Sequence, residues 1–239
     1  RSRDAAWPRI DVDANSVFVP NTIPRHIVRP NGDRGPSAVV SAYIEAARAA
    51  ERVGQRHLAR SQYEEALRML SRGDELPTAP TILRWIAGSY FADANHAAAE
   101  DCVTAAIATA EAWGDEVAVG HAINMLGVFR WQQGELDEAV QLYNAARERA
   151  VHTGDAKLAA ITAQNLGVIA NIRGDFTRAL QFYQAALADY RSMGLVRDVC
   201  IALNNLGMVY TDTERWDEAE LSYREAIEVV RDLRDIALR

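Results

Sequence analysis

Apolar residues recur at helical spacing in paired segments along the chain. In residues 156–173 they stand three to five positions apart, at Leu158, Ile161, Leu166 and Ile169. Residues 176–191 gather apolar residues on one side of a second helix, namely Ala179, Phe182, Tyr183, Ala186, Leu187 and Tyr190. Between the two segments, Gly174 is a C-cap signal, and the same Gly-Asp pair recurs at 114–115 and 154–155. The pattern predicts helical hairpins.

The hairpin pattern repeats five times with a period of 40 residues. A small residue occupies one position of each repeat: Ala47, Ala87, Gly127, Gly167 and Gly207. Alanine follows twelve residues later, at Ala59, Ala99, Ala139, Ala179 and Ala219. Sixteen residues after the small position stand Tyr63, Val103, Tyr143, Tyr183 and Tyr223, and three further on is alanine again. We expect helices to cross closely at Gly167 and Ala179, because a larger side chain would cost roughly 1–3 kcal/mol there, and the tyrosine to fill the gap beside them.

This spacing of a small residue, alanine, tyrosine and alanine resembles the tetratricopeptide repeat. The unit of 40 residues, with its Asn-Leu-Gly start at 165–167 and 205–207, is similar to repeats of kinesin light chains, spindle-orientation adaptors and bacterial peptide-sensing regulators. The second repeat departs from the pattern, since Val103 replaces the tyrosine and Ala94 the glycine of the turn. The resemblance implies an all-α solenoid of about five hairpins.

The predicted organisation is an extended N-terminal segment or linker followed by the solenoid. Residues 1–39 hold five of the seven prolines and lack helical periodicity. We expect them to dock on the solenoid of their own chain, or on that of a neighbouring copy in a self-association, with Trp7, Phe18, Val19, Ile23 and Ile27 as anchors; the alternative is a linker from an upstream domain. The repeats are assigned to residues 40–79, 80–119, 120–159, 160–199 and 200–239. No strand pattern competes within these repeats.

The last helix of the solenoid is predicted to leave apolar surface uncovered. The residues concerned are Ile227, Val230, Leu233 and Ile236. Because solenoids normally finish with a polar cap, we expect further repeats, a further domain or self-association at this end.

Candidate binding residues follow from the resemblance, which places the first helix of each repeat on the concave surface. They are Arg48, Arg52, Arg84, Phe91, His121, Asn124, Trp131, Gln164, Asn171 and Asn204. The row Asn124, Gln164 and Asn204 is the central prediction, because a side-chain amide can donate to and accept from the backbone of an extended peptide. Trp131 and Phe91 would add apolar contact, and the arginines would favour acidic side chains. The alternative is that these amides bridge neighbouring helices, with Trp131 packed inside; Asn165 is expected at the rim.

Composition narrows the classes of function. The 239 residues include 26 basic and 33 acidic ones, and this net charge of −7 argues against nucleic-acid or anionic-membrane binding. No apolar run reaches the ~18–20 residues of a membrane helix. Cys102 and Cys200 alone make no disulfide framework, which suits a reducing, cytoplasmic compartment.

Catalytic and metal chemistry have no support in the sequence. The five histidines are scattered, no phosphate loop or nucleophile elbow occurs, and serines and threonines lack a His/Asp context. We therefore predict no enzyme, metal or cofactor, and a scaffold that binds a peptide or protein segment. The alternative is a regulatory or sensor module of a larger bacterial signalling or transcriptional protein whose output domain lies outside these residues.

Overall fold

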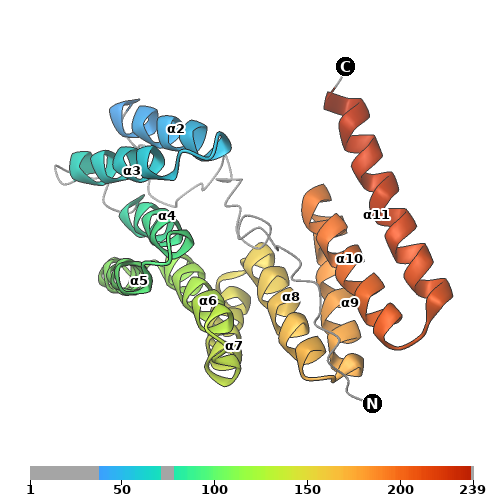
Figure 1. Cartoon of the computed structure of the whole chain (residues 1–239). Helices are drawn as coiled ribbons and strands as arrows, with labels where there is room; N and C mark the ends of the chain where they lie inside the picture. The colour runs from blue at the N-terminus through green and yellow to red at the C-terminus, as the bar shows by residue number, and fades with distance from the viewer. Residues whose placement is uncertain (1–37, 71–77, 238–239) are drawn as a thin grey trace, which may run out of the picture. The chain divides into compact units, whose positions relative to one another are not determined.

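The computed structural model describes residues 38–70 and 78–237, and these residues form ten helices and no strand (Figure 1). The helices are α2 (Ala38–Arg52), α3 (Arg56–Leu70), α4 (Ala79–Ala92), α5 (His96–Ala112), α6 (Glu116–Gln132), α7 (Leu136–Thr153), α8 (Ala156–Ile172), α9 (Phe176–Ser192), α10 (Val196–Asp212) and α11 (Trp216–Ala237). They pair into five hairpins whose first helices begin one to four residues before the predicted windows. The all-α solenoid of about five hairpins is thus confirmed. The predicted anchors between Trp7 and Ile27 lie outside the described residues.

The helices belong to two compact units, which divide between Cys102 and Val103 inside α5. In the first unit, α3 packs against both α2 and α4. In the second unit, every helix from α6 to α11 packs against the next one in the chain, and α8 also contacts α6 and α10 (Figure 1). The first helices of successive hairpins in this unit therefore lie side by side.

The turns of the hairpins follow the Gly-Asp signals. Gly154 and Gly174 both have φ of +74°, the left-handed conformation that glycine adopts without strain. The next residue then caps the following helix: a carboxylate oxygen of Asp155 accepts from the Leu158 amide at 2.9 Å, and Asp175 accepts from the Arg178 amide at 3.1 Å. The predicted turn chemistry is confirmed at these positions.

The small position of each hairpin in the second unit lies directly under the tyrosine ring. A Cβ atom added to Gly167 would stand 2.8 Å from Cε1 of Tyr183, a distance that real Cβ atoms do not tolerate. Gly127 has the same relation to Tyr143, and Gly207 to Tyr223. The expectation of close packing at these glycines is confirmed. A side chain larger than glycine would collide with the tyrosine ring. The ring lies directly on the glycine, instead of filling a separate gap beside it as expected from the sequence.

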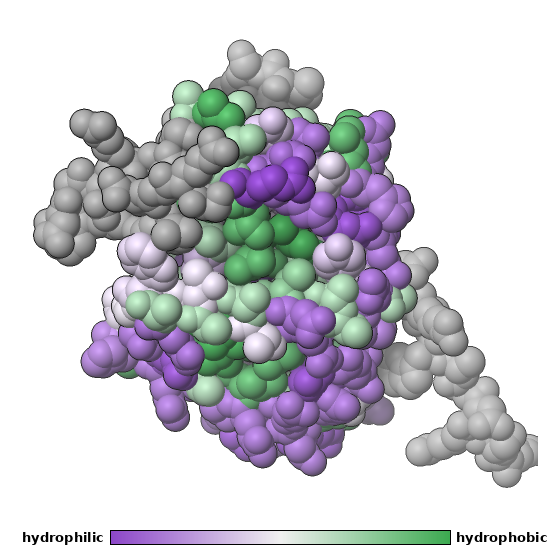
Figure 2. Space-filling view, turned by 90° about the vertical axis from the view of Figure 1, so that its left-hand side faces the viewer, coloured by the Kyte–Doolittle hydropathy of each residue, from purple (hydrophilic) through white to green (hydrophobic). Residues whose placement is uncertain are grey.

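Apolar side chains also reach the surface in both units. On the side of the molecule drawn in Figure 2, hydrophobic residues form patches between hydrophilic ones. Ile227 and Val230 of α11 are 60% and 46% exposed, as predicted for them, and the side chains of Leu233 and Ile236 lie outside the described part of the structure. Pairing of this face with another chain stays a prediction. Within the described part of the chain, no helix combines the length and apolar character needed to cross a membrane.

Candidate functional site

The three amides of the predicted binding row lie in three different environments. Asn124 of α6 is 5% exposed, and its Oδ1 accepts a hydrogen bond from Nδ2 of Asn165 at 3.1 Å. Asn165 of α8 is itself buried, so its expected place at the rim is wrong. This pair bridges the first helices of two hairpins, as the alternative interpretation of the row describes.

Gln164 and Asn171 of α8 have amide oxygens that no other described residue contacts through a hydrogen bond. The two residues are seven positions apart, so they share one face of the helix. Oε1 of Gln164 and Oδ1 of Asn171 are shielded from solvent and have no hydrogen-bond partner among the described residues. An unsatisfied buried acceptor costs about 1–3 kcal/mol, which a donor from a ligand would offset.

Asn204 of α10 is exposed, and its Nδ2 lies 3.8 Å from the sulfur of Met208. A thioether is a weak acceptor, so this amide remains available to a ligand. The three amides of the row therefore differ: Asn124 on α6 is hydrogen-bonded to Asn165, Gln164 on α8 has an unsatisfied oxygen, and Asn204 on α10 is exposed.

His121 connects α6 to the start of α8. Its Nε2 lies 2.9 Å from Oδ2 of Asp155, the same carboxylate that caps α8. Burial acts to raise the pKa of Asp155, but hydrogen bonds from His121 and the Leu158 amide, together with the charge on His121, lower it below its ordinary value. The contact holds the two first helices together at this end.

Trp131 of α6 is partly buried against an apolar cluster that includes Val128, Leu166 and Ile169. This packing matches the alternative in which Trp131 belongs to the interior. The expectation that it contacts a ligand stays a prediction.

One of the predicted residues of the first unit, Arg48, contacts a tryptophan that the sequence analysis did not single out. The guanidinium of Arg48 lies 5.1 Å from the centroid of the Trp85 ring, and Trp85 is 4% exposed. Arg52 is exposed and Arg84 half-buried. Phe91 is 9% exposed and meets the His96 ring edge-on at 4.7 Å. Arg52 is thus the most accessible of the four residues proposed here.

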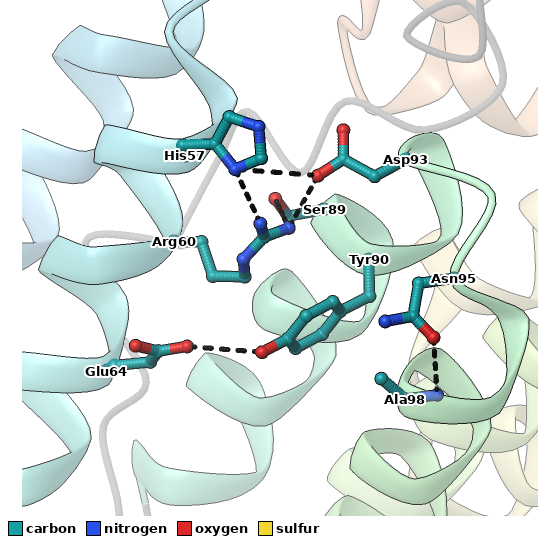
Figure 3. Close-up of polar contacts among 8 residues, drawn as sticks. All are labelled: His57, Arg60, Glu64, Ser89, Tyr90, Asp93, Asn95 and Ala98. Atoms are coloured by element: carbon teal, nitrogen blue, oxygen red, sulfur yellow. Dashed lines mark hydrogen bonds and ion pairs between the residues drawn. The ribbon is translucent and has the colours of Figure 1, made fainter.

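A polar cluster around Arg60 joins α3 to α4 and was not predicted (Figure 3). One guanidinium nitrogen of Arg60 donates to Asp93 at 2.7 Å and to Ser89 at 3.3 Å, and the other donates to Nδ1 of His57 at 2.7 Å. The guanidinium also lies over the Tyr90 ring, 4.3 Å from its centroid. The signal in the sequence was the pair Arg60 and Asp93, two opposite charges in adjacent hairpins.

In this cluster a serine, Ser89, lies near a histidine and an aspartate, which the sequence alone did not indicate. The arrangement does not activate Ser89 as a nucleophile. Arg60 lies between Ser89 and His57, and Ser89 Oγ accepts from it, so the histidine is not placed to take the hydroxyl proton. Among the described residues, no group of three or more His, Cys, Asp or Glu side chains could hold a metal ion. The arrangement is that of an interhelical clamp.

Comparison with known proteins agrees with the repeat pattern. Residues 118–192 and 199–233 match models described as tetratricopeptide repeat. None of the curated protein sequences matches the chain. These two segments are therefore tetratricopeptide repeats, as the resemblance implied for them.

Solved structures with similar folds include three of different kinds. The Rap conjugation gene regulator of plasmid pLS20, in complex with the Phr* peptide, is 21% identical with a TM-score of 0.68, over 82% of this chain and 54% of the regulator. A Pyrococcus horikoshii signal transduction ATPase with a tetratricopeptide repeat sensor is 19% identical with a TM-score of 0.67, over 83% of this chain and 30% of that one. A putative kinesin light chain with repeats, from Podosopora anserina, is 14% identical with a TM-score of 0.59, over 82% and 96%. At these identities the likeness establishes the fold.

Proposed function

We propose that the protein is a non-enzymatic interaction module whose second unit binds an extended peptide or protein segment. The observation that carries this proposal is the pair of unsatisfied amide oxygens on α8, Gln164 Oε1 and Asn171 Oδ1. Backbone amides of an extended chain are donors that recur along its length, so they suit acceptors on one helix face whatever the side chains of the ligand are.

The neighbouring first helices extend this surface. Because α8 contacts α6 and α10, the helices that carry Trp131 and Asn204 lie beside the helix that carries Gln164 and Asn171. Trp131 would add apolar contact and Asn204 a further amide. In the first unit, Arg48, Arg52 and Arg84 would favour acidic side chains of a ligand.

The Rap regulator in complex with the Phr* peptide supports a peptide as the partner, although this chain spans about half of that protein. The runner-up is a sensor module within a larger signalling protein, favoured by the ATPase with a repeat sensor, of which this chain covers 30%. The two functions differ in what is attached to the repeats. An output domain in the reading frame beyond Arg239 would favour the sensor. Cytoplasmic location and bacterial origin stay predictions.

The test begins with a peptide selected from a random display library on the immobilised protein. Its affinity is then measured by fluorescence anisotropy for the wild type and for Gln164→Leu and Asn171→Leu. We expect each substitution to weaken binding about tenfold, the equivalent of 1.4 kcal/mol, because each removes an acceptor for the peptide backbone. The same substitutions should raise the free energy of unfolding, by roughly 1 kcal/mol, because each also removes an unsatisfied buried atom.

The matched control is Gln181→Leu, which changes an exposed glutamine of α9. It should leave both the affinity and the stability unchanged. If Gln164→Leu and Asn171→Leu bound the peptide as tightly as the wild type while remaining folded, the binding site would not be on this face of α8.

A further inference from the structure

An open cavity of about 80 Å³ lies between α7, α8 and α9 in the second unit. Its apolar lining comes from Val140, Leu166, Ile169, Ala170 and Phe182, and we call it the Ala170 pocket. Leu166 and Ile169 are on the side of α8 opposite to Gln164 and Asn171, since they are two and five residues from Gln164 at 100° per residue. The pocket is therefore separate from the proposed peptide-binding face.

The position of Ala170 is a tyrosine in two other hairpins. Forty residues later stands Tyr210, and eighty residues earlier stands Tyr90. In both places the ring fills the space between helices, and Tyr210 is only 9% exposed. Ala170 ends at Cβ, so the pocket is open where the equivalent interfaces hold a phenol ring.

The group that contacts the phenol hydroxyl in those interfaces has a counterpart at the pocket. The hydroxyl of Tyr210 accepts from Nε2 of Gln184 at 3.3 Å, and that of Tyr90 donates to Oε1 of Glu64 at 3.4 Å. Asn144 stands at the equivalent position and lines the pocket. An amide can donate to or accept from a hydroxyl, so the polar end of the tyrosine site persists without its tyrosine.

An arginine accompanies each of these rings, from a different repeat position in the two interfaces. Arg60 lies 4.3 Å from the centroid of Tyr90, and Arg215 lies 4.5 Å from that of Tyr210. At the pocket the two equivalent positions are Val140 and Asp175, and the arginines among the lining residues are Arg173 and Arg178, of which Arg178 lies 5.9 Å from the centroid of Phe182. A guanidinium is electrostatically complementary to the negative face of an aromatic ring.

We propose that the Ala170 pocket binds a tyrosine side chain of a partner polypeptide. The ring enters against Leu166, Ile169 and Ala170, the hydroxyl meets the Asn144 amide, and Arg178 closes over the outer face. An enclosed cavity of about 150 Å³ holds a benzene molecule, so a pocket of about 80 Å³ takes the ring partway and leaves the remainder at the open mouth. The partner thus supplies the tyrosine ring that the chain itself supplies, as Tyr90 and Tyr210, in two other hairpins.

The test is a titration of the isotopically labelled protein with N-acetyltyrosinamide, followed in methyl and side-chain amide NMR spectra. We expect saturable shifts of the Leu166 and Ile169 methyl groups and of the Asn144 side-chain amide. N-acetylphenylalaninamide should bind several-fold more weakly, and Asn144→Leu should abolish this preference while leaving ring binding. Asn144 is exposed, so this variant keeps its fold.

A second variant fills the pocket. Ala170→Tyr should eliminate the shifts, and the matched control Ala188→Tyr, at an exposed position of α9, should retain them. The proposal is overturned if tyrosinamide causes no saturable shifts at these methyl groups, or if a folded Ala170→Tyr variant binds it as the wild type does. Equal affinity for the phenylalanine compound would overturn the assignment to tyrosine. Tighter binding of phosphotyrosinamide would replace it by phosphate recognition through Arg173 and Arg178.

Discussion

The interface of α3 with α4 and that of α7 with α8 occupy the same place in the repeat but are filled in opposite ways. In the first, Arg60 is 13% exposed and is held by Asp93, Ser89 and the Tyr90 ring. In the second, the equivalent positions of Arg60 and Tyr90 are Val140 and Ala170, and a cavity remains. The same backbone arrangement thus accommodates a charged clamp in one hairpin pair and an apolar pocket in another.

The polar residues beside these interfaces differ as well. Asp93 of the first becomes Arg173 in the second, and His57 becomes Asp137, with which Arg173 forms an ion pair. The positions that define the hairpin, such as Gly167 and Tyr183, are thus separate from those that give each interface its chemistry. Individual interfaces can change while the solenoid is kept.

Of the changes that test this comparison, replacement of Arg60 should have the largest effect on the free energy of unfolding. Arg60→Ala leaves Asp93 without its partner and removes the cation from the Tyr90 ring, so we expect a loss of about 2–3 kcal/mol in the free energy of unfolding. Urea denaturation measures this. Arg173→Ala is the matched control, since that ion pair is exposed and should contribute about 0–1 kcal/mol. Equal losses in the two variants would mean that the interfaces do not differ in how they are held.

A smaller effect is expected at a strained turn that occurs once in each unit. Ala94 and Glu214 have φ of +57° and +58° where other hairpins have glycine. Ala94→Gly and Glu214→Gly should each stabilise the protein by about 0.5–1 kcal/mol, because relief of the left-handed strain exceeds the entropy cost of glycine. Thermal unfolding provides the measurement. Ala188→Gly, in the interior of α9, should instead lower stability by about 1 kcal/mol, and a gain there would contradict the explanation.

The smallest effect concerns the histidine contacts, which are 4.0 Å to Asp93 in the first unit and 2.9 Å to Asp155 in the second. Because the pKa of Asp155 is lowered by folding, its contribution is present above the unfolded value of about 3.9 and is lost as the pH falls through the lower folded value. In His121→Gln the pKa of Asp155 should rise toward its unfolded value, so its contribution to stability should be smaller and its loss on acidification should span a narrower pH range. NMR titration of the Asp155 carboxyl in the wild type and in the variant measures this pKa. Identical titration curves would refute the interaction between His121 and Asp155.

The fold could be predicted from the sequence because it rests on short-range signals that repeat. Gly154 and Asp155 act within one turn, and the spacing of Gly167 from Tyr183 lies within one hairpin. Five copies of the same pattern reinforce each other. The position of the tyrosine ring on the glycine was not predicted, because spacing alone does not give the orientation of a side chain.

The candidate site could be predicted only in part. The helix face that carries Gln164 and Asn171 followed from register, but whether an amide is bridged or unsatisfied depends on the neighbouring hairpin, as Asn124 and Asn165 show. The Arg60 clamp joins side chains 29 and 33 residues apart in two hairpins, and its components differ from repeat to repeat. The Ala170 pocket exists because alanine stands where two other hairpins have a tyrosine ring. It can be recognised only when the repeats are compared in three dimensions.

The constant interval between Gly127, Gly167 and Gly207 and their tyrosines has a genetic consequence. In residues 127–223, an in-frame deletion or duplication of 40 codons keeps each glycine sixteen residues before a tyrosine, even when the break falls between the members of one pair. Unequal recombination between repeats can therefore lengthen or shorten the array without changing the interval between each glycine and its tyrosine. Selection can therefore change the number of hairpins separately from the side chains that contact a ligand.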